Sequence, residues 1–407
     1  MKYKNHINLI KKINEPIAIV INCYVTGLSV IRNLGRQGVP VIGLDPNPIQ
    51  IGFFSKYCIG IQCPDPYKNE NEFTQFLISL GETLNEKGVL FPCDDMYSLI
   101  ILKNRKELEK YFYFIMPEED ISLNLINKHI FYKTLEKLGI DHPKNYYKSD
   151  FNEIFEIFEK IKFPCYIKPV YSSFFKKDFD VKMFIANNKK ELLFYYKKAT
   201  EKNHEVIIQE FIPGYIDDNY CLNAYYNKDF EPIGIFSSKR RREWPIMRGC
   251  GCLIEKISDT ELIEKITYLM KNIGYFGIID AEFKLDLRDN KFKLIEINAR
   301  PWMQIGLCSK FGINHCYIAY LDAIGKKYDF KLIESNYYKW LFFYDDIKAS
   351  ITMALKNQVT FKEWIKSLKG KKEYAFFSKD DLLPFIIYTS KLILKSPIYY
   401  LSQFKNL

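Results

Sequence analysis

Residues 277–301 have the sequence Gly277-Ile-Ile-Asp-Ala-Glu282-Phe-Lys-Leu-Asp-Leu-Arg-Asp-Asn-Lys-Phe-Lys-Leu-Ile-Glu296-Ile-Asn298-Ala-Arg300-Pro301. Two apolar, strand-forming runs flank the turn at 289–290, which predicts a β-hairpin. Because successive side chains of a strand alternate between its two faces, Asp280, Glu282 and Lys284 share one face, and the apolar residues between them point into the core. The first strand therefore gathers acidic side chains on one face.

The returning strand of this hairpin places Glu296 and Asn298 on one face. With an odd number of residues in the loop, Glu282 lies opposite or nearly opposite Glu296, with Cβ atoms about 5 Å apart. Two carboxylates that close repel each other unless a cation lies between them. Glu, Glu and Asn supply hard oxygen ligands, too few to enclose a metal, which suits an Mg²⁺ ion that also binds waters and phosphates. A hairpin with ordinary solvated charges is the alternative.

The composition indicates a folded protein with more than one domain. A chain of 407 residues exceeds what one hydrophobic core usually organises, and 48% of its residues are hydrophobic and 27% charged. The net charge is +10, but Lys and Arg never form the dense run of a nucleic-acid-binding tail, so no nucleic-acid partner is expected. An excess of positive charge suits a nucleotide triphosphate, or an anionic membrane surface.

The targeting and cysteine signals favour a cytoplasmic protein. The first residues lack the apolar stretch of a signal peptide, and no run of 18 apolar residues follows. The ten cysteines include no C-x-x-C pair, which predicts buried or idle thiols in a reducing compartment. A zinc site at Cys308, His315 and Cys316 is the alternative, but a second well-spaced pair is missing.

Residues 1–118 predict an α/β domain with a parallel sheet. Strand, helix and strand follow one another over 17–44 and end at Asp45, and the same pattern continues to a helix that begins near 94. A nicotinamide-binding Rossmann domain is an alternative, because Asp45 lies where a ribose-binding acid would. However, the turn at 22–27 contains one glycine, whereas the dinucleotide fingerprint needs three. A related α/β fold that uses the same crevice for another small ligand is favoured.

The sequence after Pro117 indicates an α+β region and then a helical tail. The expected helices are 125–138, 152–160 and 189–200, and the expected strands are 163–169, 181–186, 206–211, 220–226 and 231–237. The tail from 331 onward is helical and Lys-rich, and prolines interrupt its apolar end at 382–404. Packing of this end against the main body is expected, with peripheral membrane contact as the alternative.

The motif Glu282 followed by Glu296-Ile-Asn298-Ala-Arg300-Pro301 resembles the metal-binding signature of the ATP-grasp superfamily. The sequence is most similar to the carboxylate-amine ligase branch, which includes D-aspartate ligase, and the resemblance extends to Asp380-Asp-Leu-Leu-Pro384. It implies four regions: a Rossmann-like pre-ATP-grasp domain (1–118), a lid and first nucleotide-binding subdomain (119–205), a catalytic subdomain with the metal site (206–330) and a helical C-terminal extension (331–407). The two α+β subdomains would clasp the nucleotide.

The resemblance also implies roles for single residues. Glu282, Glu296 and Asn298 would coordinate one or two Mg²⁺ ions, with Mn²⁺ as the alternative, and Lys128 and Lys168 would face the phosphates of ATP. The hinge at 209–214 would bind adenine through the backbone near Phe211 and Ile212. Glu210 would help to hold the base, and Asp218 would lie near the ribose, with Asp217 as a close alternative.

Two further segments match positions that contact phosphate in the resembling enzymes. Residues 171–174 occupy the place of a mobile, often Gly-rich loop, so Ser172 and Ser173 would bind phosphate, although no glycine lies between Gly139 and Gly214. The basic cluster Lys239-Arg-Arg-Arg242 follows a strand that should enter the cleft. Lys239, Arg241 and Arg300 would supply cations to the γ-phosphate and the acyl phosphate.

The activity that the resemblance implies is an ATP-dependent carboxylate-amine ligase. It would form an amide bond through an acyl phosphate and release ADP and phosphate, using small-molecule carboxylate and amine substrates that the sequence does not identify. A nucleotide-binding scaffold or regulator without turnover is the main alternative, and a nicotinamide-dependent oxidoreductase is another. A homodimer is the default expectation for the assembly.

Overall fold

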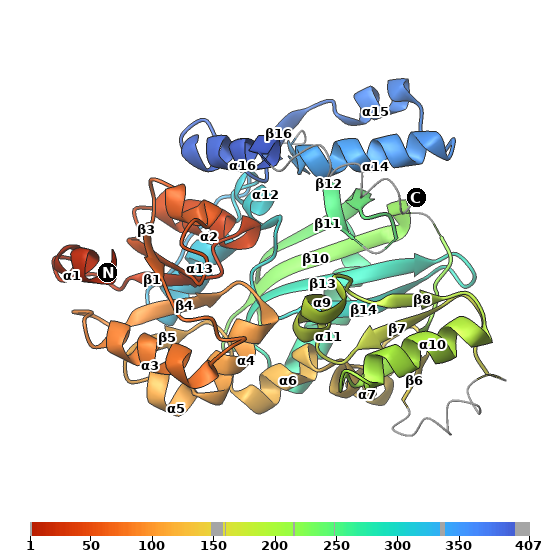
Figure 1. Cartoon of the computed structure of the whole chain (residues 1–407), viewed down its shortest axis with the longest axis horizontal. Helices are drawn as coiled ribbons and strands as arrows, with labels where there is room; N and C mark the ends of the chain where they lie inside the picture. The colour runs from red at the N-terminus through yellow and green to blue at the C-terminus, as the bar shows by residue number, and fades with distance from the viewer. Residues whose placement is uncertain are drawn as a thin grey trace.

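The computed structural model describes residues 2–147, 158, 160–214, 216–247, 249–333 and 338–394. In these parts of the chain the strands form three β-sheets with helices packed against them, so the predicted combination of α/β and α+β regions is confirmed (Figure 1). The helix predicted over 152–160 lies almost wholly outside the described residues, as does the end of the tail beyond 394. No helix of the described ranges is long and apolar enough to cross a bilayer.

The N-terminal domain contains a parallel five-stranded sheet of order β3-β2-β1-β4-β5. Its strands are β1 (Ala18–Ile21), β2 (Val41–Asp45), β3 (Ile59–Gln62), β4 (Gly88–Pro92) and β5 (Phe112–Phe114), and its helices are α1 (Lys2–Ile10), α2 (Val25–Gly35), η1 (Ile51–Phe54), α3 (Glu70–Gly81), α4 (Asp95–Lys103) and α5 (Arg105–Leu108). Ala18 and Val20 belong to the cluster that includes α2, whereas Ile19 and Ile21 belong to the one that includes α3 and α4. Both faces of the sheet are therefore covered, as in other parallel sheets.

The turn between β1 and α2 is held by Asp45 and by close packing at Gly27. The Asp45 carboxylate accepts hydrogen bonds from the Cys23 and Asn47 backbone nitrogens, both at 2.9 Å, and from the Gln50 amide at 3.1 Å. A Cβ atom on Gly27 would lie 2.2 Å from the carbonyl oxygen of Asn22. Asp45 thus stabilises the turn itself, which removes the reason for assigning it to a ribose.

The second sheet is antiparallel, with strand order β6-β9-β7-β8. Its strands are β6 (Asn145–Tyr146), β7 (Cys165–Pro169), β8 (Phe184–Ala186) and β9 (Val206–Glu210), and the helices of this region are α6 (Glu119–Ile126), α7 (Lys128–Leu138), α9 (Ser172–Phe179) and α10 (Lys189–Thr200). Helix α9 replaces the loop expected at 171–174. Phe175 and Phe179, one helical turn apart, contact each other with tilted rings and meet Phe184 edge to face, so this segment gains a packed apolar face as a helix.

The third sheet has seven strands in the order β14-β13-β10-β11-β12-β15-β16. Its strands are β10 (Asn219–Tyr226), β11 (Pro232–Trp244), β12 (Cys250–Ile257), β13 (Gly277–Asp286), β14 (Lys291–Asn298), β15 (Tyr338–Leu341) and β16 (Lys371–Tyr374), and the remaining helices are η2 (Ile216–Asp218), α11 (Thr260–Ile273), α12 (Ile305–Ser309), α13 (His315–Ala323), α14 (Phe343–Leu355), α15 (Phe361–Ser367) and α16 (Leu383–Leu394). The predicted hairpin is β13–β14. The expectation of a purely helical tail is wrong, because β15 and β16 extend this sheet.

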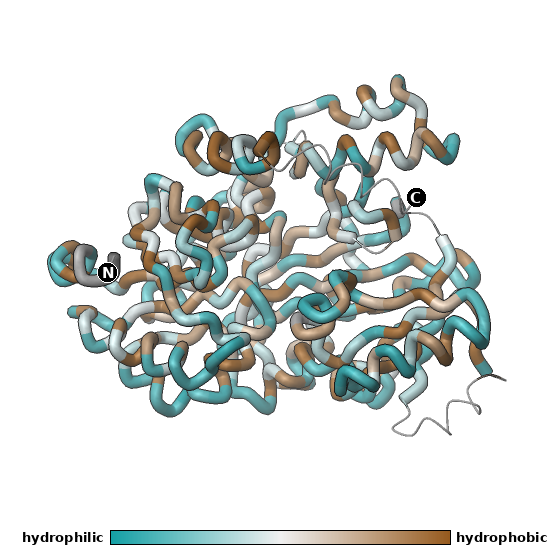
Figure 2. The backbone as a smooth tube through the Cα atoms, viewed as in Figure 1, coloured by the Kyte–Doolittle hydropathy of each residue, from teal (hydrophilic) through white to brown (hydrophobic). Residues whose placement is uncertain are grey.

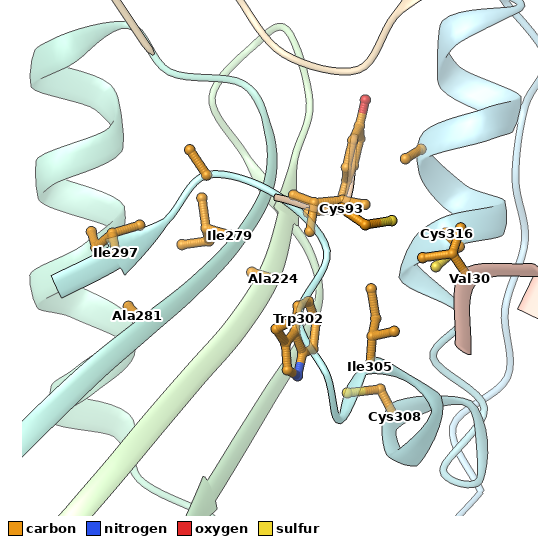
Figure 3. Packing of buried hydrophobic residues seen from close by; sticks show 14 of the residues in the cluster. Val30, Cys93, Ala224, Ile279, Ala281, Ile297, Trp302, Ile305, Cys308 and Cys316 are labelled. Carbon is orange, nitrogen blue, oxygen red and sulfur yellow. The ribbon is translucent and has the colours of Figure 1, made fainter. Parts of the chain in front are cut away.

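One continuous apolar cluster joins the N-terminal domain to the seven-stranded sheet. Figure 3 shows part of it, with Ala224 and Ile279 on sheet strands and Val30 and Cys93 from the N-terminal domain. The C-terminal helices α14, α15 and α16 lie together at one end of the molecule, beyond α2 and β12 (Figure 1). The sheets are thereby fixed relative to one another around the space described next.

Candidate active site

A large cavity of about 1790 Å³ lies between the three sheets and the C-terminal helices. The N-terminal turn at 22–26, β7, β9, the polar face of the β10–β14 region and helices α14–α16 all contribute to its lining. Pockets for small molecules usually measure about 300–1,000 Å³. The cavity is therefore large enough for a nucleotide together with further substrates.

The acidic face of the β13–β14 hairpin lines this cavity. Glu282 pairs directly with Glu296, as the alternation of the sequence predicts, and Asp280 pairs with Asn298. The Glu282 carboxylate accepts a hydrogen bond from Arg240 at 2.8 Å, and the Glu296 carboxylate lies 3.7 Å from the ammonium of Lys128. Each carboxylate thus has a cation next to it in the protein itself.

Lysines around Glu296 make this part of the cavity strongly basic. Burial alone would raise the pKa of Glu296, but Lys128, Lys168 and Lys182 together hold it well below its ordinary value. Burial lowers the pKa of Lys168 to about 8, although the charge of Glu296 acts in the opposite direction. Burying the positive charge of these lysines costs free energy, and a bound polyanion offsets that cost. This part of the cavity therefore favours a chain of phosphates.

The residues on the hairpin fit a magnesium ion. Glu282, Glu296 and the Asn298 amide offer hard oxygen atoms on adjacent strands, and these leave positions for waters and phosphate oxygens, as Mg²⁺ requires. Within the described ranges, no group of three or more His, Cys, Asp and Glu side chains could hold a metal. The zinc alternative at Cys308, His315 and Cys316 therefore receives no support.

The hinge segment after β9 lies on the cavity wall. Glu210, Phe211 and Ile212 all line the cavity, and the Glu210 carboxylate accepts a hydrogen bond from the backbone nitrogen of Lys144 at 2.9 Å. Of the two acids considered for the ribose, Asp217 lines the cavity and Asp218 does not. The geometry therefore favours Asp217 over the predicted Asp218.

The basic cluster 239–242 lies inside β11 and not in a loop after it. Because strand side chains alternate, Lys239 points to the opposite face from Arg240, and its ammonium lies 4.9 Å from the ring centre of Tyr220. Arg240 lines the cavity, and so does Arg241, because the pairing of β11 with β12 shifts register between Arg240 and Arg242; Lys239 does not line it. Arg241 donates hydrogen bonds to Asp217 and Glu255, both at 2.8 Å. The assignment of Lys239 to the phosphates is thus contradicted by the direction of its side chain.

The remaining predicted residues lie at the same cavity where their side chains are described. Lys128 donates a hydrogen bond to the Ser172 hydroxyl at 3.1 Å, and Lys168 lines the cavity beside them. The side chain of Ser173 lies outside the described residues. Arg300 donates to Asp95 at 2.6 Å and to the Asn298 amide oxygen at 3.1 Å.

Arg240 and Lys182 are among the cavity cations that the sequence predictions did not assign to the site. Ser238 pairs with Cys221, which in turn pairs with Glu282, so Arg240, two residues after Ser238, shares the face of Glu282. Strand alternation in the sequence could have placed Arg240 on this face, but only if the register between β10, β11 and β13 had been known. Lys182 lies just before β8, and its ammonium is 3.2 Å from the sulfur of Cys250. Its pKa is raised, first by Cys250 and then by the negative charge of Glu296.

Known proteins of similar sequence include a ligase and a formyltransferase. No protein-family model matches the chain. A D-aspartate ligase of Enterococcus faecium is 28% identical over 265 residues, which cover 62% of each chain. A formate-dependent phosphoribosylglycinamide formyltransferase of Methanococcus vannielii is 26% identical over 60% of this chain and 65% of its own length. The chain therefore spans less than two thirds of the length of these relatives.

Solved structures match over a larger share of the chain. An L-amino acid ligase from Bacillus licheniformis aligns with a TM-score of 0.59 over 77% of this chain and 75% of its own, at 13% identity. A biotin carboxylase from Campylobacter jejuni in complex with an ATP compound aligns with a TM-score of 0.60 over 78% and 74%, at 15% identity. The chain thus shares the fold of these enzymes, which is the ATP-grasp fold expected from the sequence. An N5-carboxyaminoimidazole synthetase from Staphylococcus aureus bound to ADP shares this ATP-grasp fold, with a TM-score of 0.59 over 78% and 81% at 16% identity.

Proposed function

We propose that this ATP-grasp protein is an ATP-dependent carboxylate-amine ligase. One observation supports this most directly: Glu282, Glu296 and Asn298 line the same cavity as the buried Lys168. Oxygen ligands for Mg²⁺ thus lie beside a cation for the phosphates, and the N-terminal and C-terminal parts of the chain leave room there for two more substrates. The reaction would join the two substrates by an amide bond and release ADP and phosphate.

The proposed reaction has two steps. First, a carboxylate oxygen of one substrate attacks the γ-phosphorus of ATP, the bond to the ADP oxygen breaks, and an acyl phosphate forms. Second, the amine nitrogen of the other substrate attacks the acyl carbon, phosphate leaves, and the nitrogen loses a proton. Both steps need charge stabilisation and positioning more than a covalent nucleophile.

The proposed roles of the protein residues follow from their places in the cavity. Glu282, Glu296 and Asn298 would hold Mg²⁺, which when bound neutralises charge on the phosphates. Lys128 and Lys168 would contact the phosphate chain, with Ser172 donating to it. Arg240 and Arg241, with Arg300, would stabilise the negative charge of the transferring phosphoryl group. The hinge residues Glu210, Phe211 and Ile212, with Asp217, would hold the nucleoside.

The proposed domain division separates the parallel sheet from the rest, but its later boundaries separate β9 from the four-stranded sheet and β15 and β16 from the seven-stranded sheet. The parallel sheet falls in 1–118, the four-stranded sheet would close over the nucleotide from 119–205 with β9 entering the next region, and the hairpin falls in 206–330. The extension 331–407 would supply one wall of the substrate space through α14–α16, whose residues line the cavity. This arrangement supports a nucleotide held between the second and third sheets, and the other substrates nearer to the N-terminal and C-terminal parts.

The substrates proposed here are a small acidic amino acid as carboxylate donor and a small-molecule amine as acceptor. The similarity to a D-aspartate ligase supports the donor class, and the basic surplus of +10 is compatible with an anionic substrate. Pairs of amino acids should therefore be screened for ATP-dependent release of phosphate.

The decisive experiment compares wild type with Glu296→Gln, which keeps the size of the side chain but removes its charge. Wild type should release phosphate from ATP only with Mg²⁺, a carboxylate and an amine all present, and the variant should be slower by about 100-fold or more. A scaffold or regulator would bind ATP without releasing phosphate under any substrate pair, and that result would overturn the ligase proposal.

A peripheral membrane contact is proposed separately for the C-terminal end. Helix α16 is apolar over most of its length (Figure 2), and Ile386, Ile393 and Leu394 are exposed near Lys391. The protein should co-sediment with anionic vesicles, and Ile393→Ser should lower the fraction that does so. If wild type does not bind the vesicles, the proposed contact is rejected. A homodimer in the cytoplasm is likewise a proposal, to be tested by light scattering.

A further inference from the structure

The side-chain amide of Asn298 lies between an acid and a guanidinium. Its nitrogen donates a hydrogen bond to Oδ2 of Asp280 at 3.0 Å, and its oxygen accepts one from Nη2 of Arg300 at 3.1 Å. Asp280 and Asn298 are paired residues on neighbouring strands β13 and β14. The contact is therefore set by the register of the hairpin.

The chemistry of the two neighbours leaves one orientation for this amide. Both carboxylate oxygens of Asp280 act as acceptors here, one for the amide of Asn223 and one for that of Asn298, and a guanidinium only donates hydrogen bonds. A flipped Asn298 would place its oxygen against the carboxylate of Asp280 and its NH₂ group against Arg300. Both contacts would then be repulsive. The direction of the Asn298 oxygen follows from its neighbours.

Both neighbours are themselves held in place. Asp280 is 6% exposed, and its other oxygen accepts a hydrogen bond from the amide of Asn223, which is 1% exposed, at 2.7 Å. Arg300 is tied to Asp95 on α4 by a 2.6 Å ion pair. The orientation of Asn298 is thus supported from inside the seven-stranded sheet on one side and from the N-terminal domain on the other.

We propose that Asp280 is a positioning residue for the metal site, because it keeps the oxygen of Asn298, and not its nitrogen, directed toward the cation. The amide oxygen has two lone pairs, of which Arg300 uses one, so the other remains for Mg²⁺. An amide nitrogen cannot ligate a cation in this way. The inference rests on the proposed function and adds to it a residue whose two carboxylate oxygens are bound by the amides of Asn223 and Asn298.

The test replaces Asp280 with Asn. The side chain keeps its size, but it has only one acceptor oxygen and cannot accept hydrogen bonds from both Asn223 and Asn298. Asn298 can then flip, and the affinity for Mn²⁺ in the presence of ATP should fall about tenfold, as is typical when a partner of a metal ligand is lost. Mn²⁺ binding to the full-length protein is measured by electron paramagnetic resonance, and ATP binding without metal should change less than twofold. Asp322→Asn, which alters a carboxylate bonded to Tyr225, is the matched control and should leave Mn²⁺ affinity unchanged.

A second variant exchanges the pair, as Asp280→Asn with Asn298→Asp. Charge and volume are conserved, and a carboxylate at 298 presents oxygen in either orientation, so Mn²⁺ affinity should return to within about threefold of wild type. Thermal unfolding checks each variant, and if Asp280→Asn does not fold, the exchanged pair decides alone. A tenfold loss in the exchanged pair, or unchanged affinity in a folded Asp280→Asn, overturns the inference. Absence of Mn²⁺ binding in wild type would instead reject the proposed metal site, and with it this role.

Discussion

Arg240 donates a hydrogen bond from Nη2 to Oε2 of Glu282 across 2.8 Å, on the face of β11 that lines the cavity. Its neighbour Lys239 lies on the other face, over the ring of Tyr220. Two adjacent basic residues thus have different surroundings, although they are equivalent as a sequence pattern. Substituting Arg240 and Lys239 one at a time therefore distinguishes the effect of a positive charge inside the cavity from the effect of a positive charge elsewhere on β11.

The first prediction concerns these two residues. Arg240→Ala should lower ATP-dependent phosphate release by about 100-fold, because a donor near the transferring phosphoryl group is lost. Lys239→Ala, one position away, should change the rate less than about threefold, since this ammonium lies over Tyr220 and does not line the cavity. Steady-state rates of both variants, with unfolding curves as a check, decide the matter. Equal losses in the two variants would contradict the proposed cavity face.

A pH dependence of ATP binding follows from Lys168. Burial lowers the pKa of this lysine to about 8 in the free protein, so the residue loses its proton as the pH rises through that value. Metal-free ATP affinity should therefore be constant below about pH 7.5 and fall by at most about tenfold per pH unit above pH 8. Lys168→Arg stays protonated over this range and should show a flat profile between pH 7 and 9. Calorimetric titrations measure the ATP affinity of the two proteins as a function of pH. If the affinity falls equally with pH in both, Lys168 is not the source of the pH dependence.

The buried pair of Arg32 and Asp381 should contribute strongly to stability. Both side chains are about 2–3% exposed, and Asp381 also accepts from the Ser55 hydroxyl at 2.8 Å. Asp381→Asn leaves a buried guanidinium without its counter-charge, which should lower the free energy of unfolding by about 3–5 kcal/mol. The neighbouring pair of Arg36 and Asp380 is more exposed, so Asp380→Asn should cost about 1 kcal/mol or less. Urea unfolding of the two variants compares them, and similar losses would show that burial does not decide the difference.

Gly27→Ala tests the tight turn at the edge of the cavity. Helix propensity alone would make this change stabilising by about 1 kcal/mol. However, the new Cβ would lie 2.2 Å from the Asn22 carbonyl oxygen, and such overpacking should destabilise by about 1–3 kcal/mol. Thr26→Ala, the preceding residue in the same helix, serves as the control. A higher melting temperature for Gly27→Ala than for wild type would show that the turn can relax.

The sequence predicted those features that depend on local alternation. The hairpin, the pairing of Glu282 with Glu296 and the parallel N-terminal sheet follow from short-range patterns of apolar and polar residues. The direction of Lys239 did not, because β11 continues to Trp244, beyond the strand end expected at 237, and because its pairing with β12 shifts register after Arg240. How far a strand extends depends on its pairing partners, which one sequence does not reveal.

Long-range contacts account for the other differences. Strands β15 and β16 are four residues each and pair with β12 and with each other, so their strand geometry comes from the sheet they join and not from their own sequence. The choice of Asp217 over Asp218 at the cavity depends on a single 3₁₀ turn. Helix α9 is different, since its Phe175 and Phe179 spacing was visible in the sequence and outweighs the analogy with a Gly-rich loop.

The ion pair of Arg32 with Asp381 has a consequence for biosynthesis. The two residues are 349 positions apart, and the guanidinium is also bound by the backbone oxygens of Phe376 and Asp381. At a ribosomal rate of roughly 5–20 residues per second, α2 emerges on the order of 20–70 s before its partner is translated. During that interval Arg32 of the nascent N-terminal domain lacks the carboxylate that neutralises it in the finished protein. The final packing of this domain is therefore completed only after nearly the whole polypeptide has left the ribosome.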